Sequence, residues 1–325
     1  MTEPVYLLIH RYVRKRATNV AMGTQIGAIT QFGEIAKDAA DAYRIARPTQ
    51  AEDAMPKFAA NHTMLYNEYA FLERFAAARA DGFEAVEFLF PYAFPKEQVA
   101  EKLRKHGLKP VLHNLPAGNW DAGERGIACL PGRTGEFQDG VGRAIEYAKA
   151  LACPRVNCLT GISPAEADAD RVHATLVDNL KFAANKLGAA GIRLLIEPIN
   201  DKDIPGFWLN YADQAVALIG EVGSSNVFLQ YDLYHQQRMS GELAATFRRL
   251  KDRIAHIQVA DNPGRNEPGT GEINYSFLFD QLDQEGYAGW IGCEYKPRTT
   301  TSEGLGWAAA YLRRSPDPRQ QALGT

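Results

Sequence analysis

Apolar positions along the chain follow two alternating patterns from Met55 onward. Short, continuously apolar runs, typical of strands buried on both faces, precede longer segments in which apolar residues recur every three or four positions, as in amphipathic helices. The alternation occurs eight times. The expected strands cover residues 58–61, 85–90, 111–115, 155–159, 193–197, 227–232, 254–259 and 290–294.

The expected helices follow these strands one by one and cover residues 69–80, 95–106, 136–151, 165–190, 212–222, 241–250, 275–285 and 303–313. Several are followed at once by glycine, as at Gly107 and Gly223, which is common just past a helix C-terminus. Such a series fits a (β/α)8 barrel, which typically needs about 250 residues. A doubly wound open sheet is the alternative, but the chain shows no glycine fingerprint for phosphate.

Four of the later strands run into an oxygen-bearing side chain, namely Glu197, Asp232, Gln258 and Glu294. Because parallel strands joined by helices have their C-terminal ends on one side, these groups should converge. Any one of them alone could be a solvated acid. Three converging carboxylates, however, repel one another unless a cation or shared protons compensate. The all-oxygen set predicts a site for Mg²⁺, with Mn²⁺ as the alternative, because zinc prefers histidine and cysteine.

Two of these ligands also have the placement of an acid–base pair. Glu197 and Glu294 come from strands separated by two others, so they can face a substrate from opposite sides. One carboxylate could remove a proton α to a carbonyl while the other acts at the neighbouring carbon, with the metal stabilising the enediolate. This pattern predicts proton transfer between adjacent carbons.

Three further residues are candidates for substrate binding. His235, expected in the loop after the sixth strand, could hydrogen-bond a substrate oxygen. Arg265, in the loop after the seventh strand, could pair bidentately with a carboxylate, with Lys296 as the second choice. His113 ends the third strand and either lines the pocket or packs in the barrel wall.

Composition narrows the class of partner. The formal net charge of −3 offers no electrostatic case for a nucleic acid. No apolar run reaches the roughly 18 residues of a membrane-spanning helix. The four cysteines form neither a C-x-x-C pair nor a zinc-finger spacing and fit buried thiols in a reducing cytoplasm. We therefore expect a cytoplasmic protein that binds a small molecule, with homo-oligomerisation left open.

Residues 1–54 differ from the rest of the chain. Their apolar run at 5–9 precedes the basic cluster at 11–16, which is the wrong order for a secretory signal, and their acidic residues argue against a transit peptide. We interpret residues 1–54 as a disordered extension, residues 55–313 as the barrel domain and residues 314–325 as a C-terminal tail. A small regulatory or contact arm is the other interpretation of the extension.

Segments spread in order between Met55 and Trp307 carry a more specific likeness: FAAN at 58–61, FLFPY at 88–92, HNLPAG at 113–118, GERGIA at 123–128, IEPIN at 196–200, QYDLYH at 230–235, EPGTGEINY at 267–275 and GCEYKP at 292–297. Together they resemble the hydroxypyruvate isomerases. The resemblance implies a xylose-isomerase-like barrel that interconverts hydroxypyruvate and 2-hydroxy-3-oxopropanoate (tartronate semialdehyde). It also implies that Glu197 and Glu294 are the proton donor and acceptor, and that both bind metal with Asp232 and Gln258.

Related families leave alternatives open. The 2-oxo-tetronate isomerases share the barrel and the metal ligands, although the segments at 114–120 and 197–200 look like the hydroxypyruvate type. Ketose epimerases usually place histidine where Gln258 stands. Abasic-site endonucleases need a histidine-rich zinc cluster and a basic face, which seven histidines and a negative net charge do not suggest. A non-catalytic sugar-acid-binding barrel would tolerate loss of a glutamate, yet all four ligand positions are filled.

Deletion of residues 1–54 should leave turnover and melting temperature nearly unchanged, because the patterned core begins at Met55. Hydroxypyruvate turnover and thermal unfolding of the truncated and full-length chains check this expectation. A large loss of soluble, folded protein on truncation would show instead that the extension packs on the barrel.

Overall fold

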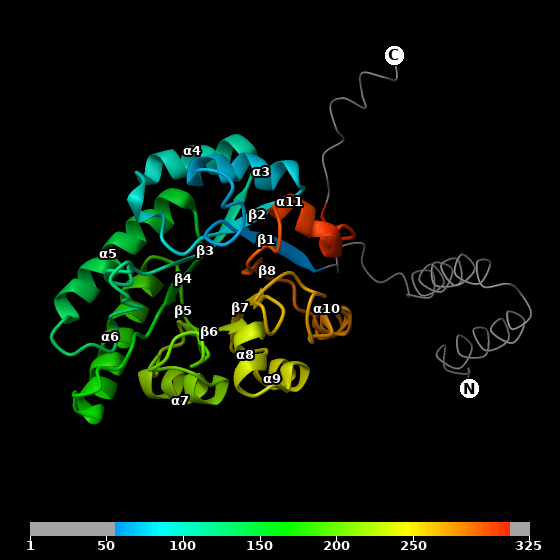
Figure 1. Cartoon of the computed structure of the whole chain (residues 1–325). Coiled ribbons are helices and arrows are strands. Elements are labelled where there is room, and N and C mark those ends of the chain that lie inside the picture. The colour runs from blue at the N-terminus through cyan, green and yellow to red at the C-terminus, as the bar shows by residue number, and fades with distance from the viewer. Residues whose placement is uncertain (1–55, 313–325) are drawn as a thin grey trace, which may run out of the picture. The chain divides into compact units, whose positions relative to one another are not determined.

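The closed sheet predicted from the sequence is present in the structure, a computed structural model that describes residues 56–312. The expected extension at residues 1–54 and the expected tail at residues 314–325 lie outside these residues. Within them, eight parallel strands follow one another in chain order, and β1 pairs with both β2 and β8 (Figure 1). The (β/α)8 barrel is therefore confirmed, and the open sheet is excluded.

The strands are short and largely buried. They are β1 (Lys57–Asn61), β2 (Ala85–Glu87), β3 (Lys109–Asn114), β4 (Arg155–Cys158), β5 (Arg193–Ile196), β6 (Val227–Asp232), β7 (Ile254–Val259) and β8 (Trp290–Cys293). Helices surround them (Figure 1). The α-helices are α3 (Arg74–Ala80), α4 (Lys96–His106), α5 (Thr134–Leu151), α6 (Ala169–Ala189), α7 (Ala212–Val222), α8 (Leu233–Met239), α9 (Leu243–Leu250), α10 (Tyr275–Gln284) and α11 (Thr301–Gly304).

Element bounds agree best in the half of the chain that carries the expected ligands. β6, β7 and α7 begin and end where the sequence predicts. β2 is shorter than expected, because the chain leaves the sheet before Pro91, which starts a 3-10 turn (Pro91–Ala93). The last predicted helix consists of α11 and a 3-10 turn (Leu305–Ala308), since Gly304 and Gly306 weaken a continuous α-helix.

Helix α8 corrects the sequence interpretation. The segment after Asp232 was expected to be a loop, but it forms a helix that begins at once after β6. Asp232 caps this helix: its Oδ1 accepts hydrogen bonds from the backbone N–H groups of Tyr234 (2.7 Å) and His235 (3.4 Å). Aspartate is among the preferred N-cap residues. His235 therefore lies in the first turn of a helix rather than in a loop.

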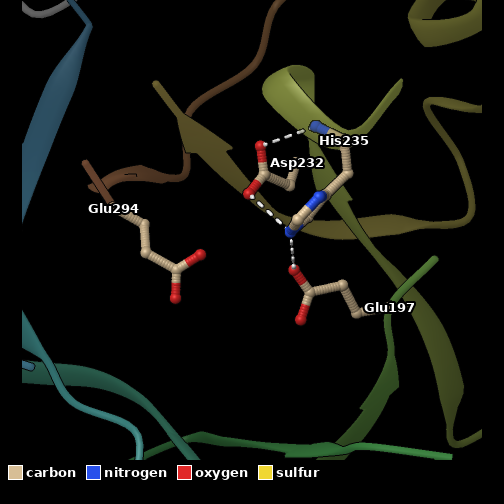
Figure 2. Close-up of side chains that lie close together, drawn as sticks. All are labelled: Glu197, Asp232, His235 and Glu294. Carbon is tan, nitrogen blue, oxygen red and sulfur yellow. Dashed lines mark hydrogen bonds and ion pairs between the residues drawn. The ribbon is translucent and has the colours of Figure 1, made fainter. Parts of the chain in front are cut away.

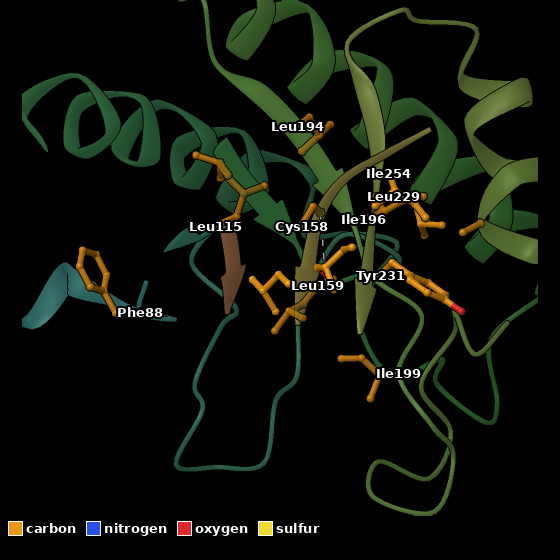
Figure 3. Close-up of a cluster of buried hydrophobic side chains, with 14 of the residues drawn as sticks. Phe88, Leu115, Cys158, Leu159, Leu194, Ile196, Ile199, Leu229, Tyr231 and Ile254 are labelled. Atoms are coloured by element: carbon orange, nitrogen blue, oxygen red, sulfur yellow. Dashed lines mark hydrogen bonds between the residues drawn. The ribbon is translucent and has the colours of Figure 1, made fainter. Parts of the chain in front are cut away.

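The core has two parts. The larger one fills the space between the sheet and the helices, and Figure 3 shows Leu194, Ile196 and Leu229 within it. The smaller one lies on the alternate strand positions and consists of mostly small residues: Ala59, Ala85, Val111, Leu112, Leu195 and Ala255. Further along these strands the same face carries polar side chains, including Asn61, Glu87 and Glu197. The barrel interior thus changes from apolar to polar toward the C-terminal ends of the strands, where barrel active sites lie.

Two other expectations concern the described residues only. The four cysteines are buried and unpaired, which confirms their interpretation as packed thiols. In the part of the chain that the structure describes, every helix is too short or too polar to cross a membrane.

Candidate active site

Four side chains meet at the C-terminal ends of the strands. Glu197 follows β5, Asp232 ends β6, His235 lies in α8, and Glu294 follows β8 (Figure 2). All four are buried, and one candidate ligand atom from each lies within 4.8 Å of the others. The structure therefore brings together three of the four predicted metal ligands, along with the histidine predicted to bind substrate.

Two carboxylate oxygens in this cluster have no hydrogen-bond partner and could bind a cation. Glu197 Oε1 and Asp232 Oδ2 are buried and have no hydrogen-bond partner among the described residues. The His235 ring lies nearby, with Nε2 3.9 Å from Glu197 Oε1 and 3.7 Å from Asp232 Oδ2 (Figure 2). Buried carboxylate oxygens are costly unless a charge or hydrogen bond satisfies them. A divalent metal ion with oxygen ligands would satisfy both oxygens at once.

The hydrogen bonds of His235 indicate a donor facing the cluster. Its Nδ1 lies 2.6 Å from Asn200 Nδ2 and 3.4 Å from the Asn200 backbone N–H, so it faces two donors and must accept. In a neutral ring the proton is then on Nε2. Burial lowers the pKa of His235 well below its ordinary value, and the charges of Arg265 and Arg238 add to this effect, which keeps the ring neutral. His235 therefore suits a hydrogen bond to a substrate oxygen better than metal ligation.

Burial dominates the electrostatics of the carboxylates. It raises the pKa of Glu197 well above its ordinary value, and repulsion from Glu294 and Asp232 adds to that shift. Burial also raises the pKa of Glu294 to about 8, although Arg265 opposes the shift. For Asp232, burial raises the pKa, while Arg265 and the two backbone N–H groups of α8 lower it. All three groups therefore hold protons more readily than exposed acids do.

Arg265 lies against the cluster rather than free in the pocket. Its Nη2 donates to Glu294 Oε2 (2.6 Å) and lies 3.8 Å from Asp232 Oδ2. The loop that carries it is fixed by Asp261, a buried residue whose carboxylate accepts from backbone N–H groups on both sides of the loop, including those of Gly269 (2.8 Å) and Ile273 (3.1 Å). The guanidinium thus supplies part of the positive charge that the carboxylates require.

A pocket of about 630 Å³ opens over Glu197, Glu294, His235 and Arg265. Other cationic side chains also line it: Arg125, Lys202, Arg238 and Lys296. Arg238 pairs with Asp203 (3.3 Å), and Lys202 pairs with Asp201 (3.3 Å). The pocket is large enough for a small organic acid, and Arg125 and Lys296 line it in addition to these ion-paired cations.

Arg125 is held differently from these paired cations. Its guanidinium lies 4.1 Å from the centre of the Trp120 ring and donates to the Trp120 and Glu124 backbone carbonyls, at 3.0 and 2.8 Å. Neither contact supplies a full negative charge, and Arg125 lines the same pocket as the catalytic candidates. A substrate carboxylate could therefore satisfy it.

Two predicted residues make their hydrogen bonds outside the cluster, although Gln258 is the register partner of Asp232. Gln258 is buried in β7, where its Oε1 accepts from Gln230 Nε2 (2.5 Å) and its Nε2 donates to Glu87 Oε1 (2.7 Å). His113 is fully buried in β3, with Nδ1 3.3 Å from the Tyr92 hydroxyl. Its neighbour Asn114 lines the pocket, so the structure places His113 in the barrel wall behind that lining.

Sequence reasoning missed the polar partners on the inner face of the strands. Asn157 Nδ2 donates to Glu197 Oε2 (3.1 Å), and Asn61 Nδ2 donates to Glu294 Oε1 (3.3 Å). Glu87 accepts a hydrogen bond from the same Asn61 amide (2.9 Å). Their only signal in the sequence is a polar side chain inside an otherwise apolar strand. That signal does not reveal which residue each one contacts.

Comparison with known proteins agrees with the fold. The xylose isomerase-like TIM barrel family model matches residues 75–314. Hydroxypyruvate isomerase of Escherichia coli (strain K12) is 54% identical over 257 residues, which cover 79% of this chain and 100% of that protein. The 2-oxo-tetronate isomerase of Cupriavidus necator is 51% identical over 260 residues, 80% of this chain and 100% of that protein.

A solved structure has the same barrel fold. The crystal structure of a family 2 AP endonuclease from Brucella melitensis superposes with a TM-score of 0.78 at 44% identity and covers 80% of this chain and 100% of that one. The match extends over the whole barrel. The chain belongs to the xylose isomerase-like TIM barrel family and, within it, to the isomerases related to hydroxypyruvate isomerase.

Proposed function

We propose that this enzyme interconverts hydroxypyruvate and 2-hydroxy-3-oxopropanoate (tartronate semialdehyde). The observation that carries the proposal is the pair of buried glutamates, Glu197 and Glu294, which share one cation-ready cluster at the floor of a pocket sized for a small acid. Both have raised pKa values, so each holds a proton more readily than an exposed glutamate does. The similarity to hydroxypyruvate isomerase supports this choice of substrate.

The reaction moves one proton between adjacent carbons and needs no external oxidant or reductant. One glutamate removes a proton from C3 of hydroxypyruvate, the C2–C3 bond becomes that of an enediol, and the other glutamate delivers a proton to C2. The hydroxyl proton on the C3 oxygen passes to the C2 oxygen, and the Nε2–H of His235 is placed to hydrogen-bond such an oxygen. Asn157 and Asn61 orient the two carboxylates.

A divalent cation completes the proposed site. We assign it to Glu197, Asp232, Gln258 and Glu294, with Mg²⁺ favoured and Mn²⁺ as the alternative, because oxygen ligands suit these ions. When bound, it would supply a Lewis acid that stabilises negative charge on the substrate oxygens. The buried carboxylate oxygens without hydrogen-bond partners support the assignment.

A second candidate substrate is a 2-oxo-tetronate, on which relatives of similar identity are named to act. It shares the carboxylate and the reacting carbons with hydroxypyruvate and adds a hydroxymethyl group at the far end. The pocket of about 630 Å³ has room for either molecule. An abasic-site endonuclease is less well supported, because the one group of candidate metal ligands found among residues 56–312 contains a single histidine.

The decisive assay supplies purified protein with hydroxypyruvate, with and without EDTA, coupled to a tartronate semialdehyde reductase. A parallel reaction with 2-oxo-tetronate ranks the two substrates by kcat/KM. Turnover of neither substrate, in protein shown to be folded, would overturn the proposed function. Turnover unaffected by EDTA would remove the metal from the mechanism.

Glu197→Gln and Glu294→Gln should each keep the fold and lower kcat at least ~10²-fold, because positioned acid–base groups contribute about that much. Steady-state kinetics with circular dichroism as the folding control tests this. If either variant turned over hydroxypyruvate at nearly the wild-type rate, the two-glutamate mechanism would be wrong.

Arg265→Lys should raise KM for hydroxypyruvate more than it lowers kcat, because lysine lacks the planar fork that grips a carboxylate. Arg265→Ala should impair both constants, since it also removes the ion pair with Glu294. Loss of one charge-assisted hydrogen bond suggests a penalty of roughly 1.5–3 kcal/mol in kcat/KM. Arg125→Lys is the matched comparison. Unchanged KM in both Arg265 variants would show that another residue, Arg125 or Lys296, binds the substrate carboxylate.

The protein without metal should lose stability as the pH rises from about 4.5 to about 8. Burial raises the pKa of Glu294 from 4.5 to about 8, so the folded chain holds more protons than the unfolded chain in that window. The free energy of unfolding therefore falls as pH rises through it. Mg²⁺ binds the ionised carboxylates, so the increase in Tm on adding Mg²⁺ should grow toward pH 8.

Thermal unfolding near pH 5 and pH 8, with EDTA or with Mg²⁺, measures this linkage. Glu294→Gln is the control, because it removes one titrating group and should reduce the pH dependence, while Glu197 and Asp232 keep their share of it. Equal stabilisation by Mg²⁺ at both pH values would contradict the assignment of the carboxylates as its ligands.

A further inference from the structure

A second buried polar cluster lies inside the barrel, centred on Glu87 of β2. Glu87 Oε2 lies 2.6 Å from His256 Nε2, and Glu87 Oε1 accepts from Gln258 Nε2 (2.7 Å) and Asn61 Nδ2 (2.9 Å). All four residues are at most 1% exposed. Three N–H groups from two strands, β1 and β7, thus converge on one carboxylate. The reaction proposed above gives this carboxylate no role.

The neighbouring strand leaves space for this carboxylate. A Cβ at Gly292 of β8 would lie 2.3 Å from both carboxylate oxygens of Glu87, so any other residue there would collide with it. Burying a carboxylate is costly without compensating hydrogen bonds. Glu87 therefore requires a glycine at position 292 of β8 and three N–H donors around it. Close packing of the barrel interior does not by itself require a charged group here.

The contacts of Glu87 determine how two amides are turned. An ionised carboxylate can only accept hydrogen bonds, so Gln258 and Asn61 must both present their NH₂ groups to it. The oxygen of Gln258 then faces the opposite way, where Gln230 Nε2 lies 2.5 Å away. The second N–H of Asn61 reaches Glu294 Oε1 (3.3 Å).

The remaining contact of Asn61 agrees with this orientation. Its Oδ1 accepts from the backbone N–H groups of Thr63 (3.0 Å) and Met64 (3.3 Å), which only an oxygen can do. The Asn61 amide is therefore fixed at both ends, and its link from Glu87 to Glu294 has one direction. Glu87 thus contacts a proposed metal ligand, Gln258, directly and a proposed catalytic group, Glu294, through Asn61.

We propose that Glu87 is a positioning residue: it holds the NH₂ group of the Gln258 side chain, which fixes the opposite direction for the carbonyl oxygen of that ligand, and through Asn61 it holds the Glu294 carboxylate in place. The proposal rests on the proposed function in that Gln258 and Glu294 act there. It does not depend on which oxo acid is the substrate. It predicts that the charge and acceptor character of Glu87 matter, rather than its shape.

Glu87→Gln tests this with nearly the same shape. Gln258 and Asn61 both donate to Glu87 Oε1, and His256 Nε2 faces Oε2, so the introduced NH₂ group must meet either the two amides or His256. At least one of the three contacts of Glu87 is therefore lost. We expect Mn²⁺ affinity, measured by titration calorimetry on the full chain, to fall about 10- to 100-fold. In saturating Mn²⁺, kcat should fall more than KM rises. Unchanged Mn²⁺ affinity and kcat in a folded variant would overturn the proposal.

The double variant Glu87→Gln with Gln258→Glu restores complementarity. The amide introduced at position 87 can donate to the carboxylate introduced at position 258, and the total charge of the pair is kept. Its Mn²⁺ affinity should exceed that of Glu87→Gln at least ten-fold. If Glu87→Gln does not fold, the double variant decides alone: Mn²⁺ affinity within ten-fold of wild type supports the proposal, and loss of Mn²⁺ binding overturns it.

Glu267→Gln is the matched control. Glu267 is also buried, but its Oε1 accepts from the backbone N–H of Arg298 (2.9 Å), outside the Glu87 cluster. Its substitution should leave Mn²⁺ affinity unchanged. Wild-type protein that binds Mn²⁺ but turns over neither oxo acid would defeat the proposed function and leave the Glu87 test intact. Wild-type protein that binds no Mn²⁺ would overturn the role of Glu87 itself.

Discussion

Repulsion among three buried carboxylates is the constraint on which the architecture of this site depends. Glu197, Asp232 and Glu294 place ligand atoms within 4.8 Å of one another in a volume from which water is largely excluded. Such a group is stable only with compensating charge or protons. Arg265 supplies one positive charge through its contact with Glu294. The oxygens that remain without hydrogen bonds could bind a cation.

The local structure around the cluster orients the groups that face it. Asp232 uses one oxygen to cap α8, which leaves its other oxygen directed at the cluster. The cap also fixes the first turn of α8, which carries His235. Asn200 then sets the tautomer of that ring from the far side. One aspartate thereby places a candidate metal ligand and a hydrogen-bond donor together, because the strand ends where the helix begins.

Much of the fold could be predicted from the sequence because buried parallel strands are continuously apolar and alternate with amphipathic helices. The sequence pattern alone predicted where β6, β7 and α7 begin and end. Helix α8 could not be predicted, because Asp232 has two roles and the sequence shows only its place at a strand end. For the site, strand ends indicated the carboxylates, but the direct partner of Arg265 depends on the path of a loop. Glu87 was missed for a related reason, since its partners come from β1 and β7 and are fixed by barrel closure.

The buried charge at Glu87 shows why stability alone does not explain the barrel interior. A well-packed apolar group is often at least as stabilising as a buried ion with its partners. A neutral amide at that position would place an NH₂ group opposite either His256 or the Gln258 and Asn61 amides, which both donate to Oε1. An ionised carboxylate accepts from all three, because it has no proton to donate. Burying this carboxylate costs free energy, but it orders the groups around Glu294. The proposed two-glutamate reaction depends on that order.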